Sequence, residues 1–206
     1  MTLAAASDGT MTAPAAERNL IPIMDALVPE LPERGAFLEL GSGTGQHVQA
    51  LAAAAPHMTF HPTDPEPDRR AAIDARCHDL PNVRPARDLD AGVPRWADGL
   101  RAQAIYAANV LHLISDAELA VLLDEAAKAL DRGGLLAFYG PFLRDGGPVS
   151  PSDDAFDAAL REQDPAIGLK DVAMVETVLG TLGLSVRRVP MPANNLLVLA
   201  RHDPRP

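Results

Sequence analysis

The sequence has little basic charge, and this limits the ligands it can hold. Among its 206 residues the only lysines are Lys128 and Lys170, and the formal net charge is −10. Proteins that bind RNA or DNA neutralise phosphates with clustered lysine and arginine. The arginines here are scattered, often beside Asp or Glu, and form no basic stripe. The composition therefore argues against a nucleic-acid substrate.

Cysteine and long apolar runs are also scarce. Cys77 has no second cysteine for a disulfide, which fits a reducing cytoplasm. No apolar run reaches the roughly 20 residues of a membrane span. Residues 1–14 lack a basic residue before their short apolar stretch, so a flexible leader is expected rather than a signal peptide. Residues 15–206 suffice for a single domain.

Apolar strand patterns alternate with helical patterns through most of the chain. They predict seven strands, at 36–40, 57–61, 82–86, 103–108, 135–139, 184–189 and 196–200. The alternation predicts a parallel sheet with right-handed crossovers. Only Pro190 to Asn194 lie between the last two strands, too few residues for a crossover helix. The expected fold class is therefore α/β: a doubly wound, mostly parallel, seven-stranded sheet with an antiparallel last strand.

The most informative segment is 37–46, where an apolar strand reaches Glu39 and then a glycine-rich turn. The glycines alternate with other residues, at Gly41, Gly43 and Gly45. A strand, a tight turn and a helix start hold nucleotide-like ligands in doubly wound folds. A dinucleotide fingerprint needs its third glycine at position 46, where Gln46 stands. The spacing instead resembles the first motif of class I S-adenosylmethionine (SAM) methyltransferases, and a glycine-rich turn without a ligand is the alternative.

Acidic residues follow the next two predicted strands. Asp64 lies about 20 residues past the glycine turn, where an acid can accept both ribose hydroxyls of an adenosine-containing ligand. It could instead cap the turn that follows it. Asp90 is the candidate to reach the adenine amino group, with Asp88 as its competitor. Trp96 could shield the adenine or belong to the core.

Two polar residues follow the strand predicted at 103–108. Asn109 would end an apolar strand, so it needs a hydrogen bond from the backbone or a ligand. His112 is the best general-base candidate among the six histidines, because an ordinary imidazole pKa suits neutral pH. Capping or packing the next helix is its alternative role. The histidines show no metal-ligand spacing, and no metal is predicted.

The chain as a whole resembles the methyltransferase-like 26 family (domain of unknown function 938). Matching strings recur in order along it, and the most specific are Tyr139-Gly140-Pro141-Phe142 and Met191-Pro192-Ala193-Asn194-Asn195-Leu196. The others are Glu17-Arg18-Asn19, Pro22-Ile23, Leu38-Glu39, Ser42-Gly43-Thr44-Gly45-Gln46-His47, Pro62-Thr63-Asp64-Pro65, Leu89-Asp90, Asn109-Val110-Leu111-His112, Phe156-Asp157 and Gly168-Leu169-Lys170-Asp171. Segments 150–154 and 167–171 depart from the family pattern on the expected substrate side, which puts the acceptor in doubt.

The resemblance implies a Rossmann-like class I methyltransferase fold with SAM (S-adenosyl-L-methionine) as cofactor. The residues expected to hold the cofactor are Glu39, Gly41, Ser42, Gly43, Thr44, Gly45, His47, Asp64, Asp90 and Asn109. His112 and Tyr139 are expected to orient or deprotonate the acceptor. The expected substrate-side residues are Arg18, Asn19, Tyr139, Phe142, Asp157, Asn194 and Asn195, although Asn194 and Asn195 could simply form a turn and Arg18 an ion pair.

The expected function is a cytoplasmic methyltransferase that acts on oxygen or nitrogen of a small molecule. Neither a nucleic acid nor a membrane is an expected partner, and the sequence does not give the oligomeric state. The first alternative is a non-catalytic SAM-binding regulator, which would not need His112 or Tyr139. The second is an NAD-dependent oxidoreductase, which Gln46 and the antiparallel last strand disfavour.

Overall fold

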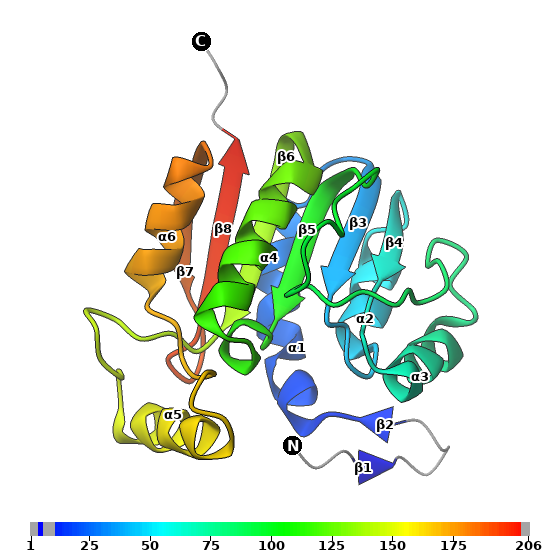
Figure 1. Cartoon of the computed structure of the whole chain (residues 1–206). Helices are drawn as coiled ribbons and strands as arrows, with labels where there is room; N and C mark the ends of the chain where they lie inside the picture. The colour runs from blue at the N-terminus through cyan, green and yellow to red at the C-terminus, as the bar shows by residue number, and fades with distance from the viewer. Residues whose placement is uncertain (1–3, 6–10, 203–206) are drawn as a thin grey trace.

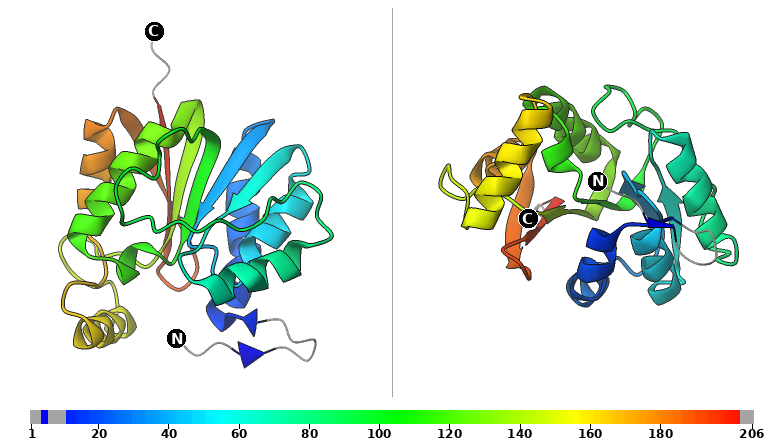
Figure 2. Two further views of the ribbon diagram at one scale, coloured as in Figure 1. Left: turned by 45° about the vertical axis from the view of Figure 1, so that its right-hand side comes forward. Right: turned by 90° about the horizontal axis from the view of Figure 1, so that it is seen from below.

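The computed structural model describes residues 4–5 and 11–202, and its main feature is one sheet with helices on both faces (Figures 1 and 2). The sheet order is β4-β3-β5-β6-β8-β7. Its strands are β3 (Gly35–Leu40), β4 (Met58–Pro62), β5 (Ala102–Ala108), β6 (Leu130–Gly140), β7 (Leu184–Pro190) and β8 (Leu196–His202). Strands β4, β3, β5 and β6 run parallel, and β8 is antiparallel to both β6 and β7. The doubly wound fold with a reversed last strand is confirmed.

The helices cover the sheet in two layers because alternate strand residues are apolar towards both faces. They are α1 (Pro14–Leu27), α2 (Gln46–Ala54), α3 (Pro67–Cys77), α4 (Asp116–Ala129) and α6 (Val172–Thr181), whereas α5 (Pro151–Gln163) lies beyond the lower edge of the sheet in Figure 1. Phe37 faces the cluster that includes residues of α1, α2 and α3, whereas its neighbour Leu38 faces the cluster that includes residues of α4 and α6. None of the helices described is long and apolar enough to cross a membrane.

The beginning of the chain adds a small strand pair. Strand β1 (Ala4–Ala5) pairs antiparallel with β2 (Met11–Thr12), and α1 follows directly. The leader expected at 1–14 falls partly on residues outside those described, namely 1–3 and 6–10. Of the rest, Met11 is held through its carbonyl by the Arg76 guanidinium at 2.8 Å.

The strand expected at 82–86 does not form, and the sheet accordingly has six strands instead of seven. That segment makes only isolated bridges, Phe60 with Val83 and Thr63 with Arg87. Pro62 of β4 has no N–H to donate to this segment, and the Ala86 N–H donates to the Asp74 carboxylate at 2.7 Å instead of to β4, so the ladder is interrupted between the two bridges.

One element boundary also differs from the sequence pattern. Glycines commonly end helices, so the pair 133–134 predicts the end of the helix before it, but α4 ends at Ala129 and β6 begins at Leu130. The extended start of β6 pairs with β5 through a register shift between Ala102 and Ala104. At its other end α4 begins as expected: the hydroxyl of Ser115 accepts from the Glu118 N–H, and the Glu118 carboxylate accepts from the Ser115 N–H.

The carboxyl ends of the parallel strands lie at the lower edge of the sheet in Figure 1, where α5 and the start of α1 also lie. In open α/β sheets ligands bind at this edge. Asn109 directly follows β5 there and has a left-handed backbone (φ 58°), a conformation that asparagine adopts more readily than most residues. This turn directs the chain into the short helix Leu111–Leu113, which carries His112.

Candidate active site

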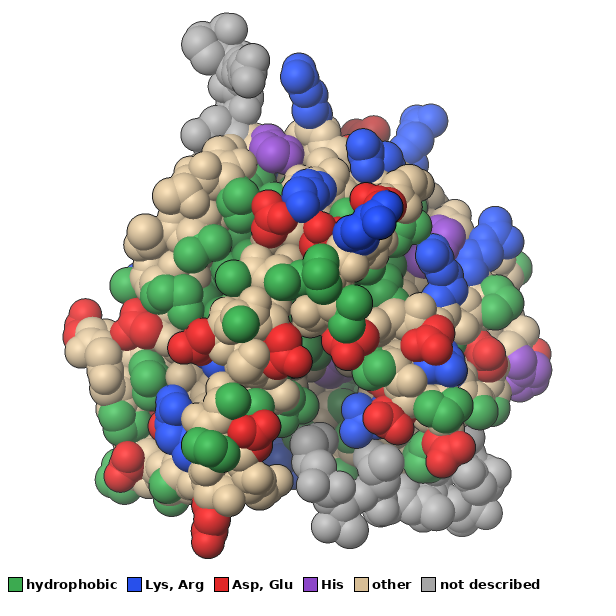
Figure 3. All heavy atoms as spheres, in the orientation of Figure 1, with side chains coloured by type: hydrophobic (Ala, Val, Ile, Leu, Met, Phe, Trp, Pro, Cys, Tyr) green, Lys and Arg blue, Asp and Glu red, His purple; other side chains and the backbone are tan. Residues whose placement is uncertain are grey.

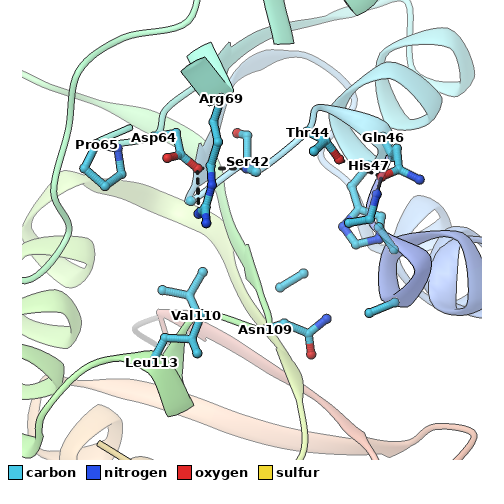
Figure 4. A pocket seen from close by; sticks show the side chains of 16 residues that line it. Ser42, Thr44, Gln46, His47, Asp64, Pro65, Arg69, Asn109, Val110 and Leu113 are labelled. Atoms are coloured by element: carbon cyan, nitrogen blue, oxygen red, sulfur yellow. Dashed lines mark hydrogen bonds and ion pairs between the residues drawn. The ribbon is translucent and has the colours of Figure 1, made fainter. Parts of the chain in front are cut away.

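A cavity of about 150 Å³ lies between the glycine-rich turn, the end of β4 and the first turn of α1 (Figure 4). Seven of the ten residues expected to hold a cofactor line it: Gly41, Ser42, Gly43, Thr44, His47, Asp64 and Asn109. It is called the loop cavity below. The other three, Glu39, Gly45 and Asp90, are not among its lining residues.

The backbone of the glycine-rich turn explains two of its glycines. Gly41 has φ 64°, and a Cβ there would come within 2.7 Å of the Val110 side chain. Gly43 has φ 59°, and a Cβ there would meet no atom within 4 Å. The first glycine is therefore required by packing and the second leaves open space beside the cavity, as a closely approaching ligand requires.

Asp64 joins the end of β4 to the glycine-rich turn. Its side chain is fully buried; Oδ2 accepts from the Gly43 N–H at 2.9 Å and Oδ1 accepts from the Glu66 N–H at 3.0 Å. The turn-capping role is thus present, together with the contact to the glycine turn. The Arg69 guanidinium lies 3.8 Å from Oδ2 (Figure 4). Since each carboxylate oxygen can accept two hydrogen bonds, Asp64 keeps acceptor capacity for ligand hydroxyls.

Gln46 occupies the space at the start of α2 that a dinucleotide would need. It is the first residue of α2, and its Oε1 accepts from the Ala13 N–H at 2.8 Å and from the Thr44 hydroxyl at 2.6 Å. The start of α1 is thereby fixed beside the N-terminus of α2, the place a dinucleotide pyrophosphate takes in doubly wound folds. The site fits a cofactor without a pyrophosphate better than NAD.

Glu39 is a buried acid behind the glycine-rich turn. Its carboxyl is almost fully buried, and among the described residues Oε2 has no hydrogen-bond partner. Burial raises its pKa to about 8; a hydrogen bond from Ser42 opposes the rise and the nearby Asp64 charge adds to it. Glu39 is therefore a neutral acid at pH 7, beside the cavity and not in its lining.

Replacing Glu39 by glutamine, which mimics the protonated acid, is expected to remove a pH dependence of folding. Because its folded-state pKa lies above its unfolded value of 4.5, its stabilising effect is complete below pH 4.5 and is lost as pH rises towards 8. Between pH 6.5 and 8.5 the wild-type free energy of unfolding should fall by about 2 kcal/mol. Urea unfolding should show this fall in the wild type and in Glu33→Gln, an exposed control. The raised pKa of Glu39 would be contradicted if the free energy of unfolding of Glu39→Gln fell with pH as steeply as that of the wild type.

A second cavity, of about 630 Å³, adjoins the first and is called the acceptor cavity below. The two share the lining residues Ala15 and Asn109. Of the residues expected to contact the acceptor, Arg18, Asn19, His112, Tyr139 and Asn195 line the acceptor cavity. Residues from α1, β6, α5 and the turn between β7 and β8 thus meet beside His112.

His112 is nearly buried, and its electrostatics differ from the sequence-based expectation. Burial lowers its pKa to about 4, and the positive charge of Lys170 lowers it further in the same direction. The interpretation that its pKa suits neutral pH is therefore wrong, although the imidazole lines the acceptor cavity as a neutral group. Its ring is edge-on to that of Phe156, with centroids 5.3 Å apart.

Asn19 connects the two cavities. Its Oδ1 lies 2.9 Å from Nε2 of His47, whose pKa burial lowers to about 4, so this imidazole is neutral at pH 7. Burial raises the pKa of the Tyr139 hydroxyl, and a hydrogen bond with Asn19 partly opposes the rise. Tyr139 therefore stays protonated at neutral pH and can donate to an acceptor, but it is not a base.

Several expected site residues lie elsewhere. The Asp90 carboxylate is exposed and accepts from the Gly92 N–H at 2.9 Å, and Phe142 is buried in the core with the α4 and α6 residues. Asp157 is bonded to Arg161 and to the Leu169 N–H. Asn194 forms, with Ala193, the left-handed centre of the tight β7–β8 turn (φ 60° and 55°). Their functional assignments stay predictions.

Other lining residues were not expected. In the loop cavity they include Gln46, Arg69 and the alanines at the start of α1. In the acceptor cavity they include Asp153 and Phe156. The departure from the dinucleotide spacing was the only signal for Gln46. Arg69 and Asp153 lie on helix surfaces by their sequence pattern, so only the tertiary structure brings them to the cavities.

The sheet order, the reversed last strand and the site at the carboxyl edge define a Rossmann-like fold of the class I methyltransferase type. The model of the family described as "Protein of unknown function (DUF938)" matches residues 10–202, and the chain belongs to this family.

Several solved structures with similar folds are methyltransferases by name. One is an O-methyltransferase family protein from Burkholderia thailandensis (TM-score 0.79, 20% identity, 92% of this chain and 57% of that one). Another is human N-acetylserotonin methyltransferase in complex with SAM (TM-score 0.74, 15% identity, 92% and 53%). A third is an O-methyltransferase family 2 protein from Planctomyces limnophilus in complex with apigenin (TM-score 0.72, 17% identity, 94% and 63%). The chain spans little more than half the length of these proteins, and at such identities the likeness establishes the fold.

Proposed function

We propose that this protein is a SAM-dependent methyltransferase that acts on an oxygen or nitrogen atom of a small molecule. The observation that carries the proposal is the pair of adjoining cavities that meet at Asn109 and Ala15. Methyl transfer is an in-line displacement, so donor and acceptor must lie on opposite sides of the transferred group. Holding two reactants in such a geometry can supply roughly 7–11 kcal/mol of the barrier.

The loop cavity suits the cofactor. SAM would supply a methyl group on a positively charged sulfur. Asp64 would accept hydrogen bonds from ribose hydroxyls, and the open face of Gly43 would let the backbone approach the amino-acid part. Asn109, whose side chain has no hydrogen-bond partner in the described part of the protein, lies between both cavities and can bind either reactant.

The acceptor cavity supplies groups for binding and proton transfer. The neutral imidazole of His112 can accept a hydrogen bond from an acceptor hydroxyl or amine and take the proton as the new bond forms. The protonated Tyr139 hydroxyl can donate to another atom of the same molecule. Positioning therefore carries most of the chemistry, with His112 receiving one proton.

The surroundings of the cavities favour a small acceptor. On the face shown in Figure 3, basic side chains gather mainly at the top, whereas acidic side chains are frequent across the middle and lower part. Where Figure 3 shows the side chains of the lower part, the basic ones are scattered among acidic ones, whereas a polynucleotide would need a basic patch. The names of the structural neighbours, with N-acetylserotonin and apigenin among them, fit a small molecule. We also propose a cytoplasmic location and membership of the methyltransferase-like 26 group.

Calorimetric titration with SAM, S-adenosylhomocysteine (SAH) and NAD in parallel tests the cofactor. We expect micromolar binding of SAM and SAH and no binding of NAD, because Gln46 and Ala13 occupy the pyrophosphate position. Binding of NAD in place of SAM would support an oxidoreductase instead. A SAM-binding regulator would bind SAM and SAH yet transfer no labelled methyl group to any acceptor.

A further inference from the structure

The acceptor cavity carries two unpaired charges of opposite sign. Among the described residues, the Arg18 guanidinium on α1 and the Asp153 carboxylate on α5 make no ion pair or side-chain hydrogen bond. Two ion pairs lie near them: Asp157 contacts Arg161 at 2.8 Å and Lys170 contacts Asp116 at 2.7 Å, so neither of these cations pairs with Asp153. The cavity therefore has one positive and one negative group available to a ligand.

The two charges come from different elements that border the same cavity. Arg18 belongs to α1, which also contributes Asn19 and Pro22 to the lining, and Asp153 belongs to the first turn of α5 beside Phe156. The start of α1 and the whole of α5 lie at the carboxyl edge of the sheet (Figure 2). His112 is neutral at pH 7, so it adds no charge to the cavity. The formal charge of the lining is balanced.

A charged side chain in a cavity loses solvation when an uncharged ligand displaces water and offers no partner. A neutral acceptor would cost the partly buried Asp153 solvation and would leave the exposed Arg18 without a partner, and a singly charged acceptor would pair with only one of the two. An acceptor with both charges would pair with both. The site would then select such an acceptor in two ways: it would attract both charged groups, and it would bind neutral analogues less tightly.

We propose that the acceptor is a small amphoteric molecule, with an anionic group bound by Arg18, a cationic group bound by Asp153, and the methylated atom at His112. The proposal rests on the methyltransferase function and names its class of substrate. The apolar part of the lining, formed by Pro22, Pro141 and Phe156, suits an aromatic ring that carries the charged groups and the methylated atom. The volume of about 630 Å³ lies within the range of small-molecule sites.

Four catechols that share one ring and carry different charges test the proposal, and the charge variants below separate charge from substituent size. Catechol is neutral, 3,4-dihydroxybenzoate is an anion, dopamine is a cation and L-DOPA is a zwitterion. Each is titrated calorimetrically into the full chain saturated with SAH, which donates no methyl group, so binding is measured without turnover. We expect L-DOPA to bind at least tenfold more tightly than catechol, with the singly charged probes between them.

Two charge variants and two matched controls locate the effect. Arg18→Gln is expected to weaken the binding of 3,4-dihydroxybenzoate and L-DOPA, which carry a carboxylate, by about fivefold to tenfold. The affinities for catechol and dopamine should not change. Asp153→Asn should weaken the binding of dopamine and L-DOPA, which carry an ammonium group, and leave the binding of catechol and 3,4-dihydroxybenzoate unchanged. The controls are Arg34→Gln, an exposed arginine away from both cavities, and Asp154→Asn, which is in the same helical turn as Asp153 but does not line the cavity.

The outcomes separate this proposal from the function on which it rests. Equal affinities for the four catechols, tighter binding of catechol than of L-DOPA, or no binding of L-DOPA overturns the amphoteric acceptor, while SAH binding leaves the methyltransferase intact. Loss of catechol binding in Arg18→Gln also overturns it, since that loss is not specific to charge. If SAH itself does not bind, the proposed function fails, and the same titrations without SAH still decide the charge preference.

Discussion

Replacing Asp64 by asparagine is expected to weaken SAH binding by on the order of 100-fold or more. An asparagine has the same shape but only one acceptor oxygen, so it cannot accept from both the Gly43 and the Glu66 N–H groups. It also loses the charge that strengthens hydrogen bonds from ribose hydroxyls, each worth about 1.5–3 kcal/mol. Calorimetric titration of the purified variant with SAH measures the loss.

Two further variants separate binding from folding. Asp79→Asn removes one negative charge from an exposed acid that lines neither cavity, and it should bind SAH as the wild type does. Gly43→Ala adds a methyl group that would meet no protein atom within 4 Å, at a backbone cost of about 1–2 kcal/mol. It should remain folded and lose SAH binding because the methyl group lies where the ligand approaches. Wild-type SAH affinity in folded Asp64→Asn and Gly43→Ala would exclude the loop cavity as the cofactor site.

The fold was predictable because its signals are local. The strand and helix periodicities predicted the parallel core, and the short segment from Pro190 to Asn194 predicted the reversed last strand. The miscounted strand had its signal in the sequence too: Pro62, in the neighbouring strand β4, has no N–H to donate to the segment between the two bridges at Val83 and Arg87. The end of α4 was misplaced because a glycine pair can lie within an irregular strand start as well as end a helix.

The candidate site was predictable to the extent that backbone geometry decides it. Gly41, Gly43 and Asp64 have spacings that one strand–turn–helix unit and the next strand fix. Asp153 could not be found in this way, because its helix meets α1 only in three dimensions. The pKa of His112 depends on its burial and on Lys170, 58 positions later in the chain, and neither is visible in the sequence near position 112.

Replacing His112 by glutamine is expected to lower kcat by at least about 100-fold while leaving the affinity for SAH unchanged. A positioned proton acceptor typically contributes 10²- to 10⁴-fold to rate, and glutamine cannot take the proton. His112 lines the acceptor cavity but not the loop cavity, so cofactor binding should not depend on it. Transfer of labelled methyl from SAM to the acceptor gives kcat, and calorimetry gives the SAH affinity. His57→Gln, at an exposed position before β4, is the matched control.

The pH dependence of the wild-type rate decides whether the imidazole acts with the pKa that its surroundings impose. A base must be unprotonated, so its contribution is lost as pH falls through its pKa. With a pKa of about 4, the rate should stay nearly level from pH 7.5 to 5.5. An imidazole with its ordinary pKa of about 6.5 would be about 90% protonated at pH 5.5 and would lose about tenfold in rate. A tenfold fall that disappears in His112→Gln would show that His112 titrates normally in the working enzyme, whereas a wild-type rate in folded His112→Gln would remove it from the reaction.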